Sequence, residues 1–294
     1  MTTTDATSAR LLKSSARHFY DPEVDIDWDA SLVEGLWFAP PERLSLYGTP
    51  LWDGLSQAQQ IELSKHEMCS IASVGLWFEL ILMQMMVREV YDQDPRTERV
   101  QYSLTEIGDE CRHSVMFAKM IERYGAPAYG PQRKVHQMGR GFKALGGGVS
   151  GYASILVAEE ILDRMQREVI GDERVQPLTR MVSRIHVLEE ARHMTFARDQ
   201  VERDVRRLSR AALVAHQVVA AQTCFMLARS LVHPDVYAAV GLDPREARRQ
   251  ALSNPHYQQT MAWAAERVLS FLREQGLVPR SQHRIWRRSL LMPA

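Results

Sequence analysis

Two short motifs of the same pattern constrain this chain more than any other feature. The first is Asp109-Glu110-Cys111-Arg112-His113, and the second is Glu189-Glu190-Ala191-Arg192-His193. Each contains a Glu-x-x-His step, and residues three apart on a helix project from the same face, so each pair can hold one metal ion. One such step is weak evidence, because it is common on solvated helix faces. Two matched copies favour helices that meet around a metal.

A carboxylate inside a run of apolar residues precedes each motif. Glu79 precedes the first and Glu159 the second. A carboxylate in such surroundings is costly to bury unless it is paired or bound to a metal. Each lies 31 residues before the motif glutamate that follows it, Glu110 or Glu190. This equal spacing is typical of a duplicated helix pair, and it selects Glu159 over its neighbour Glu160.

Together these residues predict a two-metal site. Two lone glutamates and two Glu-x-x-His pairs form the di-iron or di-manganese carboxylate site of ferritin-like bundles. Carboxylate and imidazole ligands suit iron or manganese better than softer metals, and the choice between the two stays open. The alternative is a set of polar positions on amphipathic helices, with histidines that are satisfied locally. The predicted ligands are Glu79, Glu110, His113, Glu159, Glu190 and His193.

His186 extends the second motif. With Glu190 and His193 it occupies positions i, i+4 and i+7, which share one helix face. The residue pattern leaves two interpretations open. His186 is a further nitrogen ligand, or it is a histidine of the core that supports the site.

The acids that precede the motif glutamates also have a predicted role. A ligating histidine usually donates its second ring N–H to a carboxylate or a carbonyl. We therefore expect Asp109 and Glu189 each to reach the histidine of the opposite helix, the alternative being ion pairs on the solvent side. Arg112 and Arg192 can balance acids near the site. Cys111 projects in another direction and is interpreted as a small core residue.

Helical periodicity dominates most of the chain, and alternation of the kind found in strands is missing from the sequence. The fold class expected is all-α, a ferritin-like four-helix bundle with peripheral helices. Residues 1–50 contain four prolines and are expected to form an irregular strap without a long helix. The central helices are expected at about 56–91, 100–124, 152–170 and 175–205, and the peripheral ones at about 133–145, 209–232, 244–252 and 256–275.

The whole chain, 1–294, is interpreted as a single domain. An N-terminal strap (1–55) precedes the metal-binding four-helix core (56–205), and further helices follow (206–294). A helix pair alone cannot cover its apolar face, so the two pairs should share one core.

Composition excludes several classes of protein. Lys plus Arg and Asp plus Glu both number 36, so the formal net charge is zero, which argues against a nucleic-acid binder or a polybasic membrane protein. Three widely spaced cysteines fit neither a disulfide framework nor a zinc site, and a reducing cytoplasm is the expected location. The apolar stretch 211–231 contains several polar residues and is interpreted as a buried helix, not a membrane span. A homodimer through this stretch stays open.

With His186, the second motif resembles that of the non-haem di-iron N-oxygenases typified by p-aminobenzoate N-oxygenase. In that family it has the form His-x-x-x-Glu-x-x-His, as here from His186 to His193. The N-terminal run Phe19-Tyr20-Asp21-Pro22 through Asp25-Ile26-Asp27-Trp28, and Leu46-Tyr47-Gly48-Thr49 through Trp52, are similar too. The likeness covers about residues 17 to 205. It implies that His186 is a metal ligand.

The resemblance also implies a reaction. Two Fe(II) ions would reduce O2 to a bridging peroxide, giving a peroxo-diferric intermediate that oxidises an amine, expected to be an arylamine, to a hydroxylamine, nitroso or nitro product. Electrons would come from a separate reductase or a small reductant, because the chain has neither a dinucleotide fingerprint nor an iron–sulfur cysteine set. Two alternatives remain: C–H hydroxylation or desaturation at the same site, and iron handling of the ferroxidase type. The aromatic strap and the C-terminal helices suggest a walled substrate pocket, which favours an enzyme.

Overall fold

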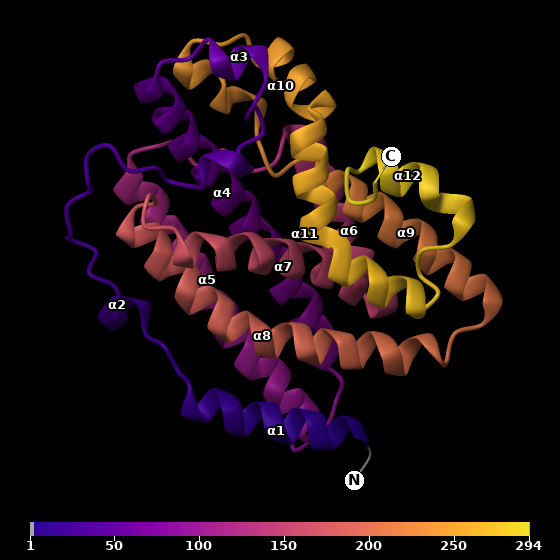
Figure 1. Cartoon of the computed structure of the whole chain (residues 1–294). Coiled ribbons are helices and arrows are strands. Elements are labelled where there is room, and N and C mark those ends of the chain that lie inside the picture. Colours follow the sequence, from indigo (N-terminus) through magenta and orange to yellow (C-terminus); the bar gives the residue numbers. More distant parts are fainter. Residues whose placement is uncertain (1–2, 294) are drawn as a thin grey trace.

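The computed structural model describes residues 3–293, which contain twelve α-helices and no strand. Four long helices form the core: α4 (Gln57–Val90), α5 (Glu98–Tyr124), α7 (Gly148–Gly171) and α8 (Pro177–Val205). Helix α4 packs against α5 and α7 against α8, and the two pairs meet through contacts of α5 with α8 and of α4 with α7. Figure 1 shows this arrangement. It confirms the all-α, ferritin-like fold expected from the sequence.

Local signals in the sequence set the ends of these helices. Ser56 and Gln59 form a reciprocal capping box at the start of α4, as the sequence predicts. The Thr97 side chain accepts the backbone N–H of Val100 at the start of α5. Helix α5 ends at Gly125, whose φ of 64° is a left-handed conformation that glycine adopts without strain.

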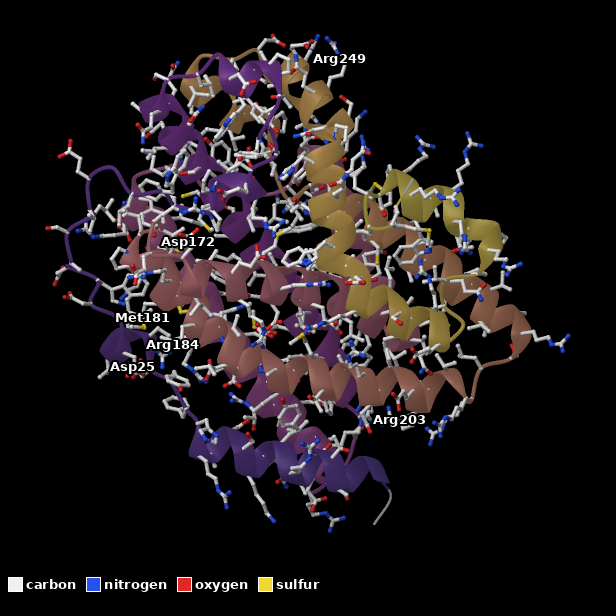
Figure 2. All side chains as sticks on the ribbon, viewed as in Figure 1. Asp25, Asp172, Met181, Arg184, Arg203 and Arg249 are labelled. Atoms are coloured by element: carbon white, nitrogen blue, oxygen red, sulfur yellow. The ribbon has the colours of Figure 1, made fainter. Side chains whose placement is uncertain are left out.

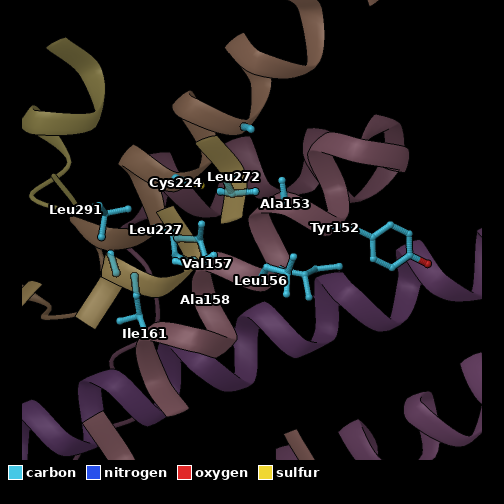
Figure 3. Packing of buried hydrophobic residues seen from close by; sticks show 14 of the residues in the cluster. Tyr152, Ala153, Leu156, Val157, Ala158, Ile161, Cys224, Leu227, Leu272 and Leu291 are labelled. Carbon is cyan, nitrogen blue, oxygen red and sulfur yellow. The ribbon is translucent and has the colours of Figure 1, made fainter. Parts of the chain in front are cut away.

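Helix α7 lies at the centre of the molecule. Every residue from 149 to 161 is buried. Helices α4 and α8 pack against it, and so do α9 (Arg210–Ala228) and α11 (Pro255–Glu274). Figure 3 shows Leu156 and Val157 of α7 packed near Leu227 of α9 and Leu272 of α11. A helix that is covered on all sides must be apolar all round, and the few charged residues it holds therefore need partners.

The expectation that residues 1–50 lack a long helix is wrong. Residues 3–17 form a helix, α1 (Thr3–Arg17), which packs against α5 and α8 and lies at the bottom of the molecule in Figure 1. All four prolines lie after this segment, so none opposes a helix there. Leu11 of α1 is 3% exposed, which shows that packing against the core supports the helix.

The chain between α1 and α4 runs over the surface as a strap with two single-turn helices, α2 (Pro22–Asp25) and α3 (Pro50–Asp53). Its backbone is fixed to the α7–α8 turn. The N–H of Trp37 donates to the carbonyl of Arg174, and the N–H of Gln176 donates to the carbonyl of Trp37. The strap thereby covers the end of the bundle at which α8 begins.

Helix α7 begins earlier than expected, at Gly148 and not near residue 152. The glycines at 146–148 do not stop it, because a side chain from another helix caps its first turn. The backbone N–H of Ser150 donates to Nδ1 of His216 on α9, at 3.2 Å. Helix α6 (Arg133–Leu145), which precedes it, has the bounds that the sequence predicts.

The C-terminal part adds α9, α10 (Pro244–Ser253), α11 and α12 (His283–Arg288), of which α12 was not expected. Two helices, α4 and α9, are long and apolar enough to cross a membrane by length and composition. Two thirds of the apolar window of α4 is buried inside the protein, as in a core helix, but only 33% of that of α9. Helix α9 is therefore less buried than expected, and Val214 and Val218 are exposed on it.

Candidate metal centre

The seven predicted ligands come from all four core helices. None has more than 6% of its surface exposed. Helix α8 has an exposed side and a buried side. Met181 and Arg184, labelled in Figure 2, are exposed, whereas its predicted ligands, two histidines and Glu190, are buried. The ligand positions are Glu79 on α4, Glu110 and His113 on α5, Glu159 on α7, and His186, Glu190 and His193 on α8.

Four of these side chains converge. Donor atoms of Glu110, His113, Glu190 and His193 all lie within 4.8 Å of one another. Nδ1 of His113 is 3.2 Å from Oε1 of Glu190, and Nδ1 of His193 is 3.0 Å from Oε1 of Glu110. The two Glu-x-x-His pairs thus face each other across the interface between α5 and α8.

A second group contains Glu79, His113 and His186. Nε2 of His186 is 3.6 Å from Oε1 of Glu79 and 3.3 Å from Oε1 of Glu190. The other ring nitrogen of His186 is hydrogen-bonded to Oε1 of Gln166 at 2.8 Å. His186 therefore turns one nitrogen toward the cluster and uses the other to fix its ring.

Glu159 and Glu160 are neighbours with different surroundings. Glu160 accepts hydrogen bonds from Arg198 of α8. Neither carboxylate oxygen of Glu159 has a hydrogen-bond partner, although the side chain is only 6% exposed. Glu159 lies outside the two close groups, but Glu190 and Glu110 act on it electrostatically. Of the two neighbours, Glu159 is the one placed to serve the cluster.

The outer acids contact the histidines in a crossed arrangement. Oε2 of Glu189 on α8 is 2.9 Å from Nε2 of His113 on α5, and Oδ2 of Asp109 on α5 is 3.2 Å from Nε2 of His193 on α8. Arg192 lies 3.3 Å from Asp109, and Arg112 is also bonded to it. Each acid can hold the proton of one histidine ring on Nε2, which leaves Nδ1 free to bind a metal.

The pKa values of the cluster shift according to the charges that surround each group. Burial by itself lowers the pKa of His193, but Glu190, Glu106 and Glu110 outweigh it and raise that pKa well above its ordinary value. Burial raises the pKa of Glu159, and the charges of Glu190 and Glu110 raise it further. For Asp109, burial raises the pKa, but His193 and the two arginines lower it to about 2.

The donor atoms themselves fit a metal. Nδ1 of His193 and Oε1 of Glu110 lie 3.0 Å apart, yet neither makes a hydrogen bond. Oε2 of Glu190 and both oxygens of Glu159 are likewise buried without a partner. Such atoms are costly unless something binds them, and lone pairs that converge on one place are what a cation requires. The cluster therefore has a donor set of carboxylates and imidazoles that fits a metal centre.

One buried acid near the cluster was missed in the sequence. Glu106 lies one helical turn before Glu110 on α5, is 1% exposed, and has no hydrogen-bond partner on either carboxylate oxygen. Burial raises its pKa well above the ordinary value. Its i−4 spacing from Glu110 was the signal that could have identified it. Cys111 was also misjudged: it is exposed, not part of the core.

A narrow cavity of about 60 Å³ lies along the bundle next to the cluster. Its wall includes one residue from each core helix that is three or four positions from a predicted ligand. These residues are Gly75, Phe117, Leu162 and Ser183, near Glu79, His113, Glu159 and His186 respectively. Gln166, the hydrogen-bond partner of His186, also lines it. On each core helix a lining residue thus lies within one helical turn of a predicted ligand, although none of the seven ligands lines the cavity itself.

Comparison with known proteins identifies the family. The model of the p-aminobenzoate N-oxygenase AurF family matches residues 1–276. The chain belongs to this family. Similar proteins include the uncharacterized proteins Mb0909 of Mycobacterium bovis and Rv0885 of Mycobacterium tuberculosis, each 30% identical over 210 residues. These matches cover 69% of this chain and 62% of the length of each relative. Family membership and the buried Glu/His cluster together indicate a metal centre.

Proposed function

We propose that the protein is an O2-dependent di-iron oxygenase that oxidises the nitrogen of an amine, with an arylamine as the expected substrate. The observation that carries the proposal is the buried cluster of three glutamates and three histidines, with Glu159 buried nearby, in a chain of the AurF family. The residues that would hold two iron ions are Glu79, Glu110, His113, Glu159, His186, Glu190 and His193.

Two iron ions in such a ligand set supply the redox and Lewis-acid chemistry that activates O2. Oxidation of an amine to a hydroxylamine inserts one oxygen atom into an N–H bond. The other oxygen atom leaves as water, and the balance consumes two protons and two external electrons. Further rounds give the nitroso and nitro oxidation levels. We assign the electron supply to a separate reductase or a small reductant.

The chain's own residues position and shield the chemistry. Glu189 and Asp109 hold the ring protons of His113 and His193, and Gln166 fixes the ring of His186. Because the histidines and the two acids are buried, their orientation is set before any substrate enters. The apolar wall of the adjacent cavity excludes water from the place where the amine would lie.

The cavity supports an organic substrate over iron handling of the ferroxidase type, since an enzyme that oxidises only iron needs no apolar chamber. C–H hydroxylation or desaturation would use the same cavity and remains the second candidate. We extend the proposal to a cytoplasmic location, because all three cysteines are free thiols. A homodimer through the exposed valines of α9 stays a prediction.

Stopped-flow absorption tests the proposed function. The protein is loaded with Fe(II) without oxygen, mixed with O2, and followed with and without an arylamine. We expect a visible chromophore that the amine discharges, and a product that carries one oxygen atom from labelled O2. A featureless ferric centre that ignores the amine would overturn the proposal in favour of iron handling. Oxygen found on carbon would favour the hydroxylase.

A further inference from the structure

The cavity beside the metal centre has a distinct polar end. Glu67 lines it, on the same helix as Glu79 but twelve residues earlier, which is about 18 Å along the helix axis. Between the two, the wall is formed largely by apolar side chains such as Ile71 and Phe117. On α4 the lining ends at Gly75, eight residues or about 12 Å after Glu67 and one helical turn before Glu79. A molecule that fills the cavity therefore has one end near Glu67, an apolar middle, and a second end one helical turn from the metal centre.

Glu67 is a buried carboxylate fixed in one orientation. It is 2% exposed, and it accepts hydrogen bonds from the backbone N–H of Ser45, at 3.0 Å, and from the Ser45 hydroxyl, at 2.5 Å. The Ser45 hydroxyl is in turn 2.9 Å from the hydroxyl of Tyr237. The strap thus holds Glu67 by neutral donors. Within residues 3–293 it makes no ion pair with a cation.

Arg43, the basic residue that lines the same cavity, is already engaged. Its guanidinium donates two hydrogen bonds to the carboxylate of Glu168 and a third to the hydroxyl of Thr260 at 3.4 Å. The Cζ atom of Arg43 lies 4.3 Å from the ring centre of Trp263. A substrate carboxylate would have to displace Glu168 to use it. In this cavity, Glu67 is therefore a hydrogen-bond acceptor that is not paired with a cation, whereas the cation Arg43 is already paired with Glu168.

An unpaired carboxylate in the interior reduces stability and is typical of binding sites. Burial raises the pKa of Glu67 to about 7, even though the hydrogen bonds from Ser45 act to lower it. A cationic group placed against it would offset the cost of burying its charge. Among the described residues none places a cationic group in contact with Glu67, which leaves this role open to a ligand.

We propose that Glu67 anchors the end of the substrate that is remote from the oxidised nitrogen, and that this end carries an ammonium or another cationic hydrogen-bond donor. The substrate class is then an elongated diamine with an apolar or aromatic middle, and not an aminoarene carboxylate. This inference rests on the proposed function, because it takes the metal end of the cavity as the reactive end.

Equilibrium binding to the Fe(II)-loaded protein without oxygen tests the anchor. Three probes share an aniline ring and a chain of four methylene groups in the para position, and they end in an ammonium, a methyl or a carboxylate. We expect the ammonium probe to bind at least tenfold more tightly than the methyl probe, and the carboxylate probe to bind most weakly. Tightest binding of the carboxylate probe would overturn the proposal and assign the anchor to Arg43.

Variants of Glu67 distinguish the effect of its charge on probe binding from the effect of its size. Glu67→Gln has nearly the same size and should bind the ammonium and methyl probes with equal affinity, whereas Glu67→Asp, which keeps the charge, should retain part of the preference. Glu62→Gln, at a partly exposed position of the same helix where the carboxylate is paired with Lys65, is the control outside the cavity and should behave as the wild type. An undiminished preference in Glu67→Gln would overturn the proposal.

Admitting O2 distinguishes this inference from the proposed function. If the charge preference is present but no probe is oxidised, the anchor stands and the proposed oxygenase function fails. If all three probes are oxidised at nitrogen with equal affinity and the Glu67 variants make no difference, the function stands and the anchor fails.

Discussion

At the scale of single residues, adjacent positions on a helix have different surroundings, because their side chains project about 100° apart around the helix axis. Both carboxylate oxygens of Glu159 are buried without a hydrogen-bond partner, whereas Glu160 is paired with Arg198. The two carboxylates have the same chemistry and almost the same burial, at 6% and 8% exposure. Only direction separates a predicted ligand from an ordinary ion pair.

This pair gives the first prediction. Glu159→Gln removes a negative ligand while keeping its volume, so we expect metal affinity to fall at least tenfold, in line with the effect of losing even an outer partner of a metal site. Glu160→Gln should keep two metal ions per chain. Metal content after dialysis against a limiting chelator, measured by elemental analysis, checks both variants. Equal metal content in the two would contradict the assignment of Glu159.

The second prediction concerns Glu67 and pH. Its pKa is 4.5 in the unfolded chain and about 7 in the folded protein, so the folded state is penalised once the unfolded carboxyl ionises. The contribution of the protonated carboxyl to stability is fully present below pH 4.5, and it is lost as the pH rises from there through 7. The full difference is about 3 kcal/mol, from 1.36 kcal/mol per pKa unit. The Glu67→Gln substitution removes this pH-dependent loss of stability, because glutamine does not ionise.

We therefore expect the free energy of unfolding of Glu67→Gln to rise relative to the wild type by about 2–3 kcal/mol between pH 5 and pH 8. Urea unfolding of both proteins at a series of pH values measures this difference. Parallel stability curves for the two would show that the carboxyl of Glu67 titrates normally in the folded protein.

At the scale of secondary-structure elements, close approach of helices decides which residues are tolerated. Helix α6 packs on α4, and Gly139 of α6 faces Trp77 of α4. A methyl group added at Gly139 would lie 2.3 Å from the Trp77 ring and 3.2 Å from the Ile81 side chain, so the ring or the helix would have to shift. Gly141, two residues later, is exposed and has nothing within 4 Å of such a group.

The two glycines give a matched pair of variants and the third prediction. Gly141→Ala should stabilise the protein by about 0.5–1 kcal/mol, because alanine favours a helix more than glycine does. Gly139→Ala should destabilise it by about 1–3 kcal/mol through overpacking against Trp77. Thermal unfolding of both variants is the measurement. If both substitutions stabilise the protein, α6 does not pack on α4 as closely as the structure shows.

At the scale of the whole molecule, the core contains more buried carboxyl groups than basic groups. Seven carboxyl groups are buried around the cluster, and only two guanidinium groups accompany them. The acids are Glu79, Glu106, Asp109, Glu110, Glu159, Glu189 and Glu190, and the bases are Arg112 and Arg192. Two divalent ions would supply four positive charges, which offsets most of the excess. Metal binding and folding should therefore be strongly coupled.

The fourth prediction follows from this coupling. Addition of Fe(II) without oxygen, or of Mn(II), should raise the melting temperature of metal-depleted protein, and the shift should increase with metal concentration because the ions bind the folded state. Glu110→Ala and Glu190→Ala should show a much smaller shift. Differential scanning calorimetry checks this result. A melting temperature that is indifferent to metal in the wild type would argue against a metal centre in the core.

The sequence by itself determined the helices of the core and the residues that face its axis. Both depend on local geometry: the 3.6-residue period, the i, i+3 step of Glu110 and His113, and the caps at Ser56 and Thr97 follow from the covalent chain and its nearest neighbours. The spacing of 31 residues also selected Glu159 over Glu160, because it repeats a helix pair. Their roles as metal ligands stay a prediction.

Tertiary structure alone decided the rest. Helix α1 is stable because α5 and α8 cover it, and α7 begins at Gly148 because His216 of a later helix caps it. Glu67 becomes an unpaired buried acid only where the strap brings Ser45 to it and Arg43 is paired with Glu168 elsewhere. These contacts join residues far apart in the chain. Their energies depend on burial and on which other charged groups lie nearby in the folded protein, and no local pattern of residues encodes either.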